Sequence, residues 1–261
     1  MMILYAAAVL GGAGLLCGAL LAVASKYLAV ETDSRVEKIT EVLPNANCGG
    51  CGFAGCSAFA TAVVSGEASV DGCSAGGAKT AAAVAEVMGV TASVGTPKVA
   101  SVKCRGTLNA AASRYEYDGI EDCTAAARLG GGQKACAYAC LGFGSCVKAC
   151  PFGAISVING VAEVDTEKCT GCGACAKVCP KKVIEIIPKD TKYFVACSSQ
   201  NKGIEMKTKC SAGCIACRLC EKNCPSGAVT VENNLARIDY SKCTGCGVCK
   251  EKCPKNIIIE R

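Results

Sequence analysis

The residues of this 261-residue chain that could do chemistry are cysteines, and their spacing repeats. One run reads C-x₂-C-x₂-C-x₃-C-P and consists of Cys169, Cys172, Cys175, Cys179 and Pro180. This is the spacing of bacterial-type [4Fe–4S] clusters, in which the fourth cysteine binds a neighbouring cluster. The run recurs as Cys243, Cys246, Cys249, Cys253 and Pro254. A zinc site needs only two C-x₂-C pairs, so the spacing favours iron–sulfur clusters over zinc or disulfides.

A different cysteine pattern precedes these runs. Cys48, Cys51 and Cys56 are spaced C-x₂-C-x₄-C, and Cys73 follows. We expect these four to close around one [4Fe–4S] cluster, with glycines letting backbone N–H groups approach the sulfur atoms. The glycines at 50, 52 and 55 also fit a dinucleotide-binding pattern, but no predicted strand leads into them, so a nucleotide site is not predicted.

The crossover of the fourth cysteine predicts which residues share a cluster. In the C-terminal half the two sets are Cys214, Cys217, Cys220 and Cys253, and Cys224, Cys243, Cys246 and Cys249. In the half before it, the complete set is Cys150, Cys169, Cys172 and Cys175. The other set has only Cys140, Cys146 and Cys179, because Phe143 occupies the position that matches Cys217.

We assign the missing fourth ligand to Cys136, one helical turn from Cys140. Cys104 or Cys123 could also reach this site, and a three-iron cluster is an alternative. Five clusters are therefore predicted. Four cysteines remain unassigned and either bind a sixth cluster or are ordinary buried thiols: Cys104, Cys123, Cys197 and Cys210. No residue is given a catalytic role.

The composition fits a metal-bound protein. The chain has 25 cysteines but no histidine, which excludes His-ligated haem, Rieske clusters and histidine acid–base catalysis. Aromatic residues make up only 5%, so we expect metal ligation to supply much of the folding free energy. Reduced thiols indicate a cytosol-facing protein. The formal net charge of +6 is offset by clusters that carry about −2 each, and no nucleic-acid partner is expected.

The elements that position the cysteines are short and duplicated. Nine cysteines between 123 and 179 recur at an offset of 74 residues. Asn159-Gly160 and Asn233-Asn234 each separate two β-branched stretches and predict hairpins. Strands over 183–187 and 257–259 close the two halves, and short helices follow the cysteine runs. The predicted fold class is α+β, with tandem two-cluster ferredoxin-like modules.

The predicted organisation has five parts: an anchor at 1–25, a single-cluster domain at 26–92, a connector or insertion at 93–133, and modules at 134–190 and 191–261. Residues 1–25 carry no charge and suit one transmembrane helix of about 20 apolar residues. A signal peptide is the alternative, but no basic residue precedes the apolar run. Lys26, Arg35 and Lys38 follow it, which places the clusters on the cytoplasmic side of the cell's inner membrane.

These features together resemble one family. A membrane helix, the run Cys48-Gly49-Gly50-Cys51-Gly52, and then ferredoxin-like modules are similar to the B subunit of the Rnf electron-transport complex, in its longer form with two modules. The resemblance implies an electron-transfer subunit of an ion-translocating ferredoxin:NAD⁺ oxidoreductase, without a complete active site of its own. It implies as partners reduced ferredoxin, the membrane and peripheral subunits of that complex, and membrane lipid through one helix.

Two other classes of function stay open. One is a polyferredoxin subunit of a membrane hydrogenase or another oxidoreductase, which would carry the same cysteine runs. The other is a non-catalytic assembly or redox-sensing protein, whose clusters would not be reduced by low-potential ferredoxin. Cluster potentials range from roughly −700 to +450 mV, and spacing alone does not select among them.

Overall fold

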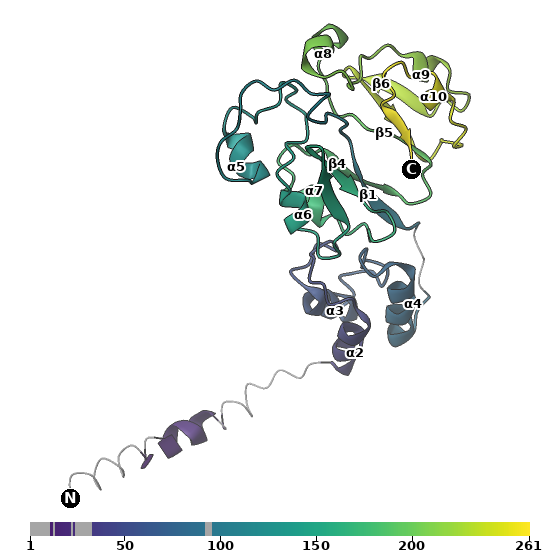
Figure 1. Ribbon diagram of the computed structural model, residues 1–261. Helices are drawn as coiled ribbons and strands as arrows, with labels where there is room; N and C mark the ends of the chain where they lie inside the picture. Colours follow the sequence, from purple (N-terminus) through teal and green to yellow (C-terminus); the bar gives the residue numbers. More distant parts are fainter. Residues whose placement is uncertain (1–10, 13, 22, 24–32, 92–95) are drawn as a thin grey trace, which may run out of the picture.

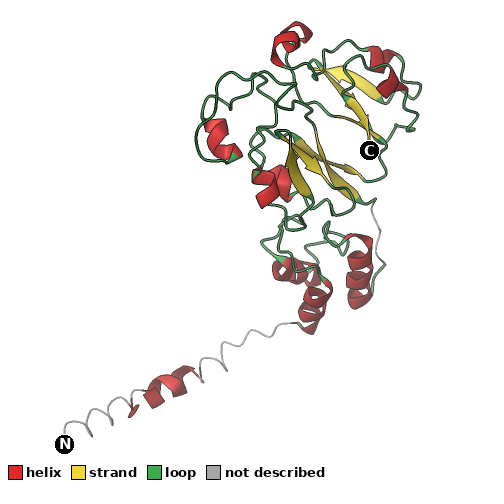
Figure 2. Cartoon of the chain, in the orientation of Figure 1, coloured by secondary structure: helices red, strands yellow, loops and turns green. Residues whose placement is uncertain are grey.

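The structure is a computed structural model that describes residues 11–12, 14–21, 23, 33–91 and 96–261. Of the anchor expected over 1–25, residues 1–10, 13, 22, 24 and 25 lie outside these ranges. Within the described ranges, no helix has the length and apolar character needed to cross a membrane. From residue 33 onward, Figure 1 shows a helical unit followed by two units that contain strands, and Figure 2 shows that the strands belong to the latter two.

The helical unit comprises α2 (Ser34–Val42), α3 (Cys56–Val64) and α4 (Gly77–Met88). Asp33 is the N-cap of α2 and accepts a hydrogen bond from the backbone N–H of Arg35, as helix-capping preferences predict. Ile39, Phe59 and Val84 are fully or almost fully buried where the three helices meet. This small core fixes the loop between α2 and α3, which carries Cys48 and Cys51 and leads into Cys56, the first residue of α3.

The two other units repeat one arrangement. Module 1 contains β1 (Lys98–Val102), α5 (Cys123–Arg128), α6 (Ser145–Lys148), β2 (Ile155–Ile158), β3 (Val161–Val164), α7 (Ala174–Val178) and β4 (Ile184–Pro188). Module 2 contains β5 (Tyr193–Val195), α8 (Gly203–Lys209), α9 (Leu219–Lys222), β6 (Val229–Glu232), β7 (Leu235–Ile238), α10 (Val248–Glu251) and β8 (Ile258–Glu260). From α6 onward, each element of module 1 begins 74 residues before its counterpart in module 2, which confirms the duplication.

In the described chain the strands form four two-stranded antiparallel sheets, β1–β4, β2–β3, β5–β8 and β6–β7. The two predicted hairpins are confirmed as β2–β3 and β6–β7. Their turns use left-handed residues, with φ of 48° at Asn159, 73° at Gly160, 48° at Asn233 and 61° at Asn234. Asparagine and glycine tolerate this conformation, which matches the twist of the flanking strands.

One strand has a role that the predicted connector at 93–133 did not include. β1 pairs with β4 from Lys98↔Pro188 to Val102↔Ile184, so it completes a sheet of module 1. Val99, Ala100 and Val102 are buried there, and the pairing satisfies backbone groups that burial would otherwise leave without partners. The insertion therefore lies between β1 and the rest of module 1, and β1 departs from the 74-residue repeat.

Candidate metal centres

The loops that carry the cysteines share an unusual backbone. Residues between successive cysteines are left-handed, and the set comprises Gly142, Gly144, Gly171, Gly173, Ala216, Arg218, Gly245 and Gly247. Six of these are glycines, for which a positive φ carries no steric penalty, whereas Ala216 and Arg218 adopt it at some cost. With this backbone conformation, the side chains of successive cysteines can point toward the same pocket.

Three pockets are each lined by four cysteines, and they have similar sizes. The N-terminal pocket is bordered by Cys48, Cys51, Cys56 and Cys73 and has about 340 Å³ of empty space, part of it open to solvent. The pocket in module 2 is bordered by Cys214, Cys217, Cys220 and Cys253 and has about 320 Å³ of such space. The pocket in module 1 is bordered by Cys123, Cys140, Cys146 and Cys179 and has about 330 Å³. Three cysteine cages of one size suit one kind of occupant.

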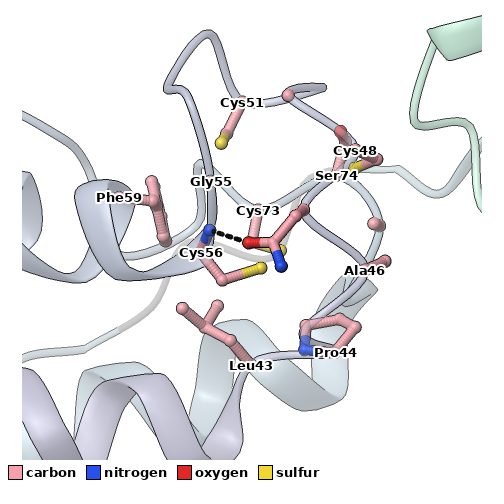
Figure 3. A pocket seen from close by; sticks show the side chains of 13 residues that line it. Leu43, Pro44, Ala46, Cys48, Cys51, Gly55, Cys56, Phe59, Cys73 and Ser74 are labelled. Carbon is pink, nitrogen blue, oxygen red and sulfur yellow. Dashed lines mark hydrogen bonds between the residues drawn. The ribbon is translucent and has the colours of Figure 1, made fainter.

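Figure 3 shows the N-terminal pocket, with the side chains of Cys48, Cys51, Cys56 and Cys73 around it. Asn47 holds the loop, because its Oδ1 accepts the backbone N–H of Cys56 at 2.8 Å. Phe59 closes one wall and packs edge-on against Phe53, with ring centroids 5.8 Å apart. Apart from the thiols, the lining of this pocket is mostly apolar.

The pocket of module 1 differs from the sequence prediction. Cys123, not Cys136, lines it beside Cys140, Cys146 and Cys179. Phe143, which replaces a cysteine in the repeat, instead packs against Tyr117 with ring centroids 4.8 Å apart. The chain thus brings a cysteine from the insertion to the place that Cys217 occupies in module 2.

Local hydrogen bonds explain how Cys123 reaches this pocket. Asp122 caps α5, where its side chain accepts the N–H groups of Thr124 and Ala125. Ser145 at the start of α6 donates to Asp122 Oδ2 at 2.7 Å and accepts the N–H of Cys123 at 2.8 Å. These bonds lower the pKa of Asp122 and fasten the two helix starts together. Because the contact joins residues 23 apart, cysteine spacing alone does not reveal it.

The two remaining predicted sets also lie together. Burial raises the pKa of Cys175 most, and charge repulsion from Cys169, Cys172 and Cys150 adds to it. Burial likewise raises the pKa of Cys249, and Cys243, Cys224 and Cys246 add to it in the same way. Backbone N–H groups donate to these sulfur atoms, from Ala154 to Cys150 at 3.4 Å and from Ala100 to Cys169 at 3.3 Å. Such bonds stabilise thiolates and tune cluster potentials.

Burial makes the metal-free thiols hard to ionise. It raises the pKa of Cys146 and Cys175 to about 12, and of Cys220 to about 11, with smaller contributions from nearby thiols. A metal that binds thiolate must displace these protons, and its charge supplies the compensation that the apolar surroundings lack. Among the described residues, no three Cys, Asp or Glu side chains converge as a site for a single metal ion. The donor sets fit a larger, four-cornered group such as a [4Fe–4S] cluster.

The N-terminal pocket contacts module 1 directly. Gly50 approaches the carbonyl of Cys172 so closely that a Cβ atom at this position would overlap its oxygen. Lys177 of α7 donates a hydrogen bond to the carbonyl of Gly49. Cys48 is also among the charges that raise the pKa of Cys172. Ligands of two predicted clusters therefore lie on either side of one backbone contact.

Beyond Cys17, four cysteines belong neither to these three pockets nor to the two remaining sets: Cys104, Cys136, Cys197 and Cys210. Cys136, Cys197 and Cys210 are each 6% exposed. They lie where module 1 meets module 2, with Cys136 and Cys210 on segments that flank residues 110–112.

Comparison with known proteins agrees with these centres. Family models match residues 43–75 ("Putative Fe-S cluster"), 140–154 and 162–185 ("4Fe-4S binding domain") and 213–257 ("4Fe-4S dicluster domain"). These findings establish multiple 4Fe–4S ferredoxin domains with mixed helix and strand content.

Curated relatives cover most of the chain. The B subunit of the Na⁺-translocating ferredoxin:NAD⁺ oxidoreductase complex of Acetobacterium woodii is 47% identical over 92% of this chain and 73% of its own length. The B subunit of the proton-translocating complex of Clostridium ljungdahlii is 47% identical over 88% and 82%. The B subunit of the ion-translocating oxidoreductase complex of Methanosarcina acetivorans is 41% identical over 91% and 90%. The chain therefore belongs to the family of B subunits of the ion-translocating oxidoreductase, or Rnf, complex.

Proposed function

We propose that this chain is an electron-transfer subunit of an ion-translocating ferredoxin:NAD⁺ oxidoreductase complex. In this role it accepts electrons from reduced ferredoxin and passes them to other subunits of the complex. The proposal is supported by family membership, by the ferredoxin:NAD⁺ oxidoreductase activity in the names of two relatives, and by the cysteine cages described above. The chain contributes a relay within an oxidoreductase, and we assign no catalytic residue to it.

We assign five [4Fe–4S] clusters to five sets of cysteines. The sets are Cys48, Cys51, Cys56 and Cys73; Cys123, Cys140, Cys146 and Cys179; Cys150, Cys169, Cys172 and Cys175; Cys214, Cys217, Cys220 and Cys253; and Cys224, Cys243, Cys246 and Cys249. Cys123 replaces Cys136 as the fourth ligand of the second set because it lines the pocket. A bound [4Fe–4S] cluster takes up and releases single electrons. The residues of the chain would hold it and donate backbone N–H groups to its thiolates.

The observation that carries the relay is the contact between the N-terminal loop and module 1. Gly50 and Cys172 leave no room for a side chain between them, so the ligand shells of two clusters meet through one layer of backbone. A structural role for isolated clusters would not require this approach. We propose that electrons cross here between module 1 and the N-terminal cluster.

We also propose that residues 1–25 anchor the protein in the cytoplasmic membrane as a single helix, with the clusters on the cytoplasmic side. The uncharged sequence and the basic residues after it support this proposal. A chain that lacks residues 1–25 should leave the membrane fraction and keep its iron. Retention of the shortened chain in membranes, without its partner subunits, would contradict the anchor.

The relay is tested by mixing reduced ferredoxin with the anaerobically purified full chain. Five clusters predict at least about 20 iron atoms and as many acid-labile sulfides per chain, and ferredoxin should bleach their visible absorption. Oxidised ferredoxin is the control and should cause no bleaching. Iron below about half of that value, with zinc in its place, or clusters that stay oxidised, would overturn the proposal.

A further inference from the structure

We propose that Cys104, Cys136, Cys197 and Cys210 bind a further [4Fe–4S] cluster, which connects the two modules electrically. None of these cysteines falls within the residues that the family models match. The inference rests on the proposed function for its role in electron transfer, but the site itself is argued from the residues that surround it.

The four thiols come from separate segments that the fold brings together. Residues 110–112 lie between two of these segments, because Ala135 N–H donates to Ala112 O at 2.7 Å and Ala112 N–H donates to Lys209 O at 3.0 Å. This arrangement places Cys136 on one flank and Cys210 on the other. Cys104 follows β1, and Cys197 follows β5, so each of the two modules supplies two of the four cysteines.

The sulfur atoms of Cys104 and Cys210 are close enough to share one occupant. A Cβ atom at Gly106 would lie 3.4 Å from Cys104 Sγ and 3.6 Å from Cys210 Sγ, so these two atoms are at most about 7 Å apart. Burial raises the pKa of Cys210, and charge repulsion from the nearby Cys104 and Cys136 adds to it. Burial likewise raises the pKa of Cys197, and Cys104 is again among the neighbours that add to it. Cys104 thus lies near both thiols of module 2.

Hydrogen bonds distinguish two of these thiols from ordinary buried cysteines. Cys104 Sγ accepts the N–H groups of Gly106 at 3.3 Å and Cys140 at 3.4 Å. Cys197 Sγ accepts the N–H of Cys214 at 3.4 Å. The sulfur atoms of the assigned ligands Cys150 and Cys169 receive the same kind of bond. A neutral thiol is a weak acceptor that needs no such donors, whereas a metal-bound thiolate is stabilised by them.

A buried cation beside the site calls for an anionic occupant. Lys134 is 3% exposed, and its Nζ donates to the carbonyls of Gly106 at 2.6 Å and Gly160 at 2.7 Å. No carboxylate forms an ion pair with it among the described residues. The titratable groups that interact with its ammonium group are cysteines, among them Cys104 and Cys210. Burying an ammonium group without a counter-charge is costly, and a cluster with four thiolates supplies a net negative charge.

The site touches a cluster of each module through one hydrogen bond. Cys140, a ligand in the module 1 pocket, donates its N–H to Cys104 Sγ. Cys214, a ligand in the module 2 pocket, donates its N–H to Cys197 Sγ. The centre therefore joins the set containing Cys140 to the set containing Cys214. With the contact at Gly50, this arrangement orders the centres from module 2, through the junction and module 1, to the N-terminal pocket.

Iron analysis of the anaerobically purified full chain tests the site directly. Six cubanes predict about 24 iron atoms, and Cys136→Ala/Cys210→Ala should lose about four of them. Cys17→Ala, at an exposed cysteine outside every set, is the matched control and should lose none. An unchanged iron and sulfide content in the double variant would overturn the site. If ferredoxin fails to reduce any cluster of the wild-type chain while the iron loss is observed, the proposed function fails and the site stands.

A second variant keeps all the ligands and so does not depend on cluster assembly. Lys134→Gln should retain the full iron content but shift one cluster signal to a more negative midpoint potential, because the reduced cluster loses a nearby positive charge. Lys207→Gln, at an exposed lysine of α8, should leave every potential unchanged. Redox titrations followed by EPR measure the cluster midpoint potentials of both variants. Wild-type potentials throughout in Lys134→Gln would refute the placement of a cluster beside this ammonium group.

Discussion

Replacing Gly50 by alanine should slow electron transfer between module 1 and the N-terminal cluster without removing either cluster. The new Cβ atom would overlap the carbonyl oxygen of Cys172 and would lie 3.1 Å from Ser74 Oγ. Backbone cannot yield as a flexible side chain can, so the two units must separate by about half an ångström or more. Overpacking of this kind costs about 1–3 kcal/mol, which lowers the population of the docked arrangement about 5- to 150-fold.

The assay is single-turnover reduction by ferredoxin, with the N-terminal cluster followed by freeze-quench EPR. Gly50→Ala should retain the wild-type iron content and delay the N-terminal signal relative to the signals of module 1. Gly52→Ala is the matched control in the same loop. It introduces strain at a φ of 91° but meets no atom within 4 Å, so it should not delay transfer. If both variants transfer electrons at the wild-type rate, the contact at Gly50 is not the route.

Two further predictions concern the pocket of module 1 and the protonation of its thiols. Cys123→Ser should lose about four iron atoms per chain. Adding Phe143→Cys should restore them, because position 143 matches Cys217 in the repeat. If iron analysis shows no loss in the single variant, the assignment of Cys123 is refuted. Rebuilding clusters in the metal-free chain should release protons and proceed faster as the pH rises from neutral toward 12, since burial raises the pKa of Cys146 and Cys175 to about 12. The same raised pKa values mean that the metal-free fold keeps its full stability below the ordinary thiol pKa of 9.0 and loses it as the pH rises toward 12. Iron uptake in weakly buffered solution, followed with a pH electrode, checks the proton release, and uptake that is independent of pH would contradict it.

Features set by neighbouring residues could be predicted from the sequence. The hairpin turns at Asn159-Gly160 and Asn233-Asn234 follow from a local backbone preference, and both are present. Spacing also identified the pockets around Cys51 and Cys217. In these cases the residues that determine the structure lie within one loop, or repeat at a fixed offset.

Features set by distant contacts could not be predicted in this way. The position of Cys123 depends on the bond between Asp122 and Ser145, and the pairing of β1 depends on β4, about 86 residues away. Cysteine spacing carries no information about either contact. The choice of Cys136 relied on its closeness to Cys140 in sequence, whereas the fold turns Cys136 toward the junction with module 2.

The duplication explains why equivalent cysteines have different roles in the two modules. Cys123 and Cys197 are 74 residues apart and match in the repeat, yet Cys123 lines the pocket of module 1 while Cys197 lies at the junction. Module 2 has Cys217 to complete its own pocket, so Cys197 is free to face its neighbour. Module 1 has Phe143 there and Cys123 in the pocket, so in the proposed assignment its share of the junction comes from Cys104 and Cys136. The absence of a cysteine at position 143 is thus coupled to the way in which the two copies are joined, because the cysteine that completes the pocket of module 1 is the counterpart of one that faces the junction in module 2.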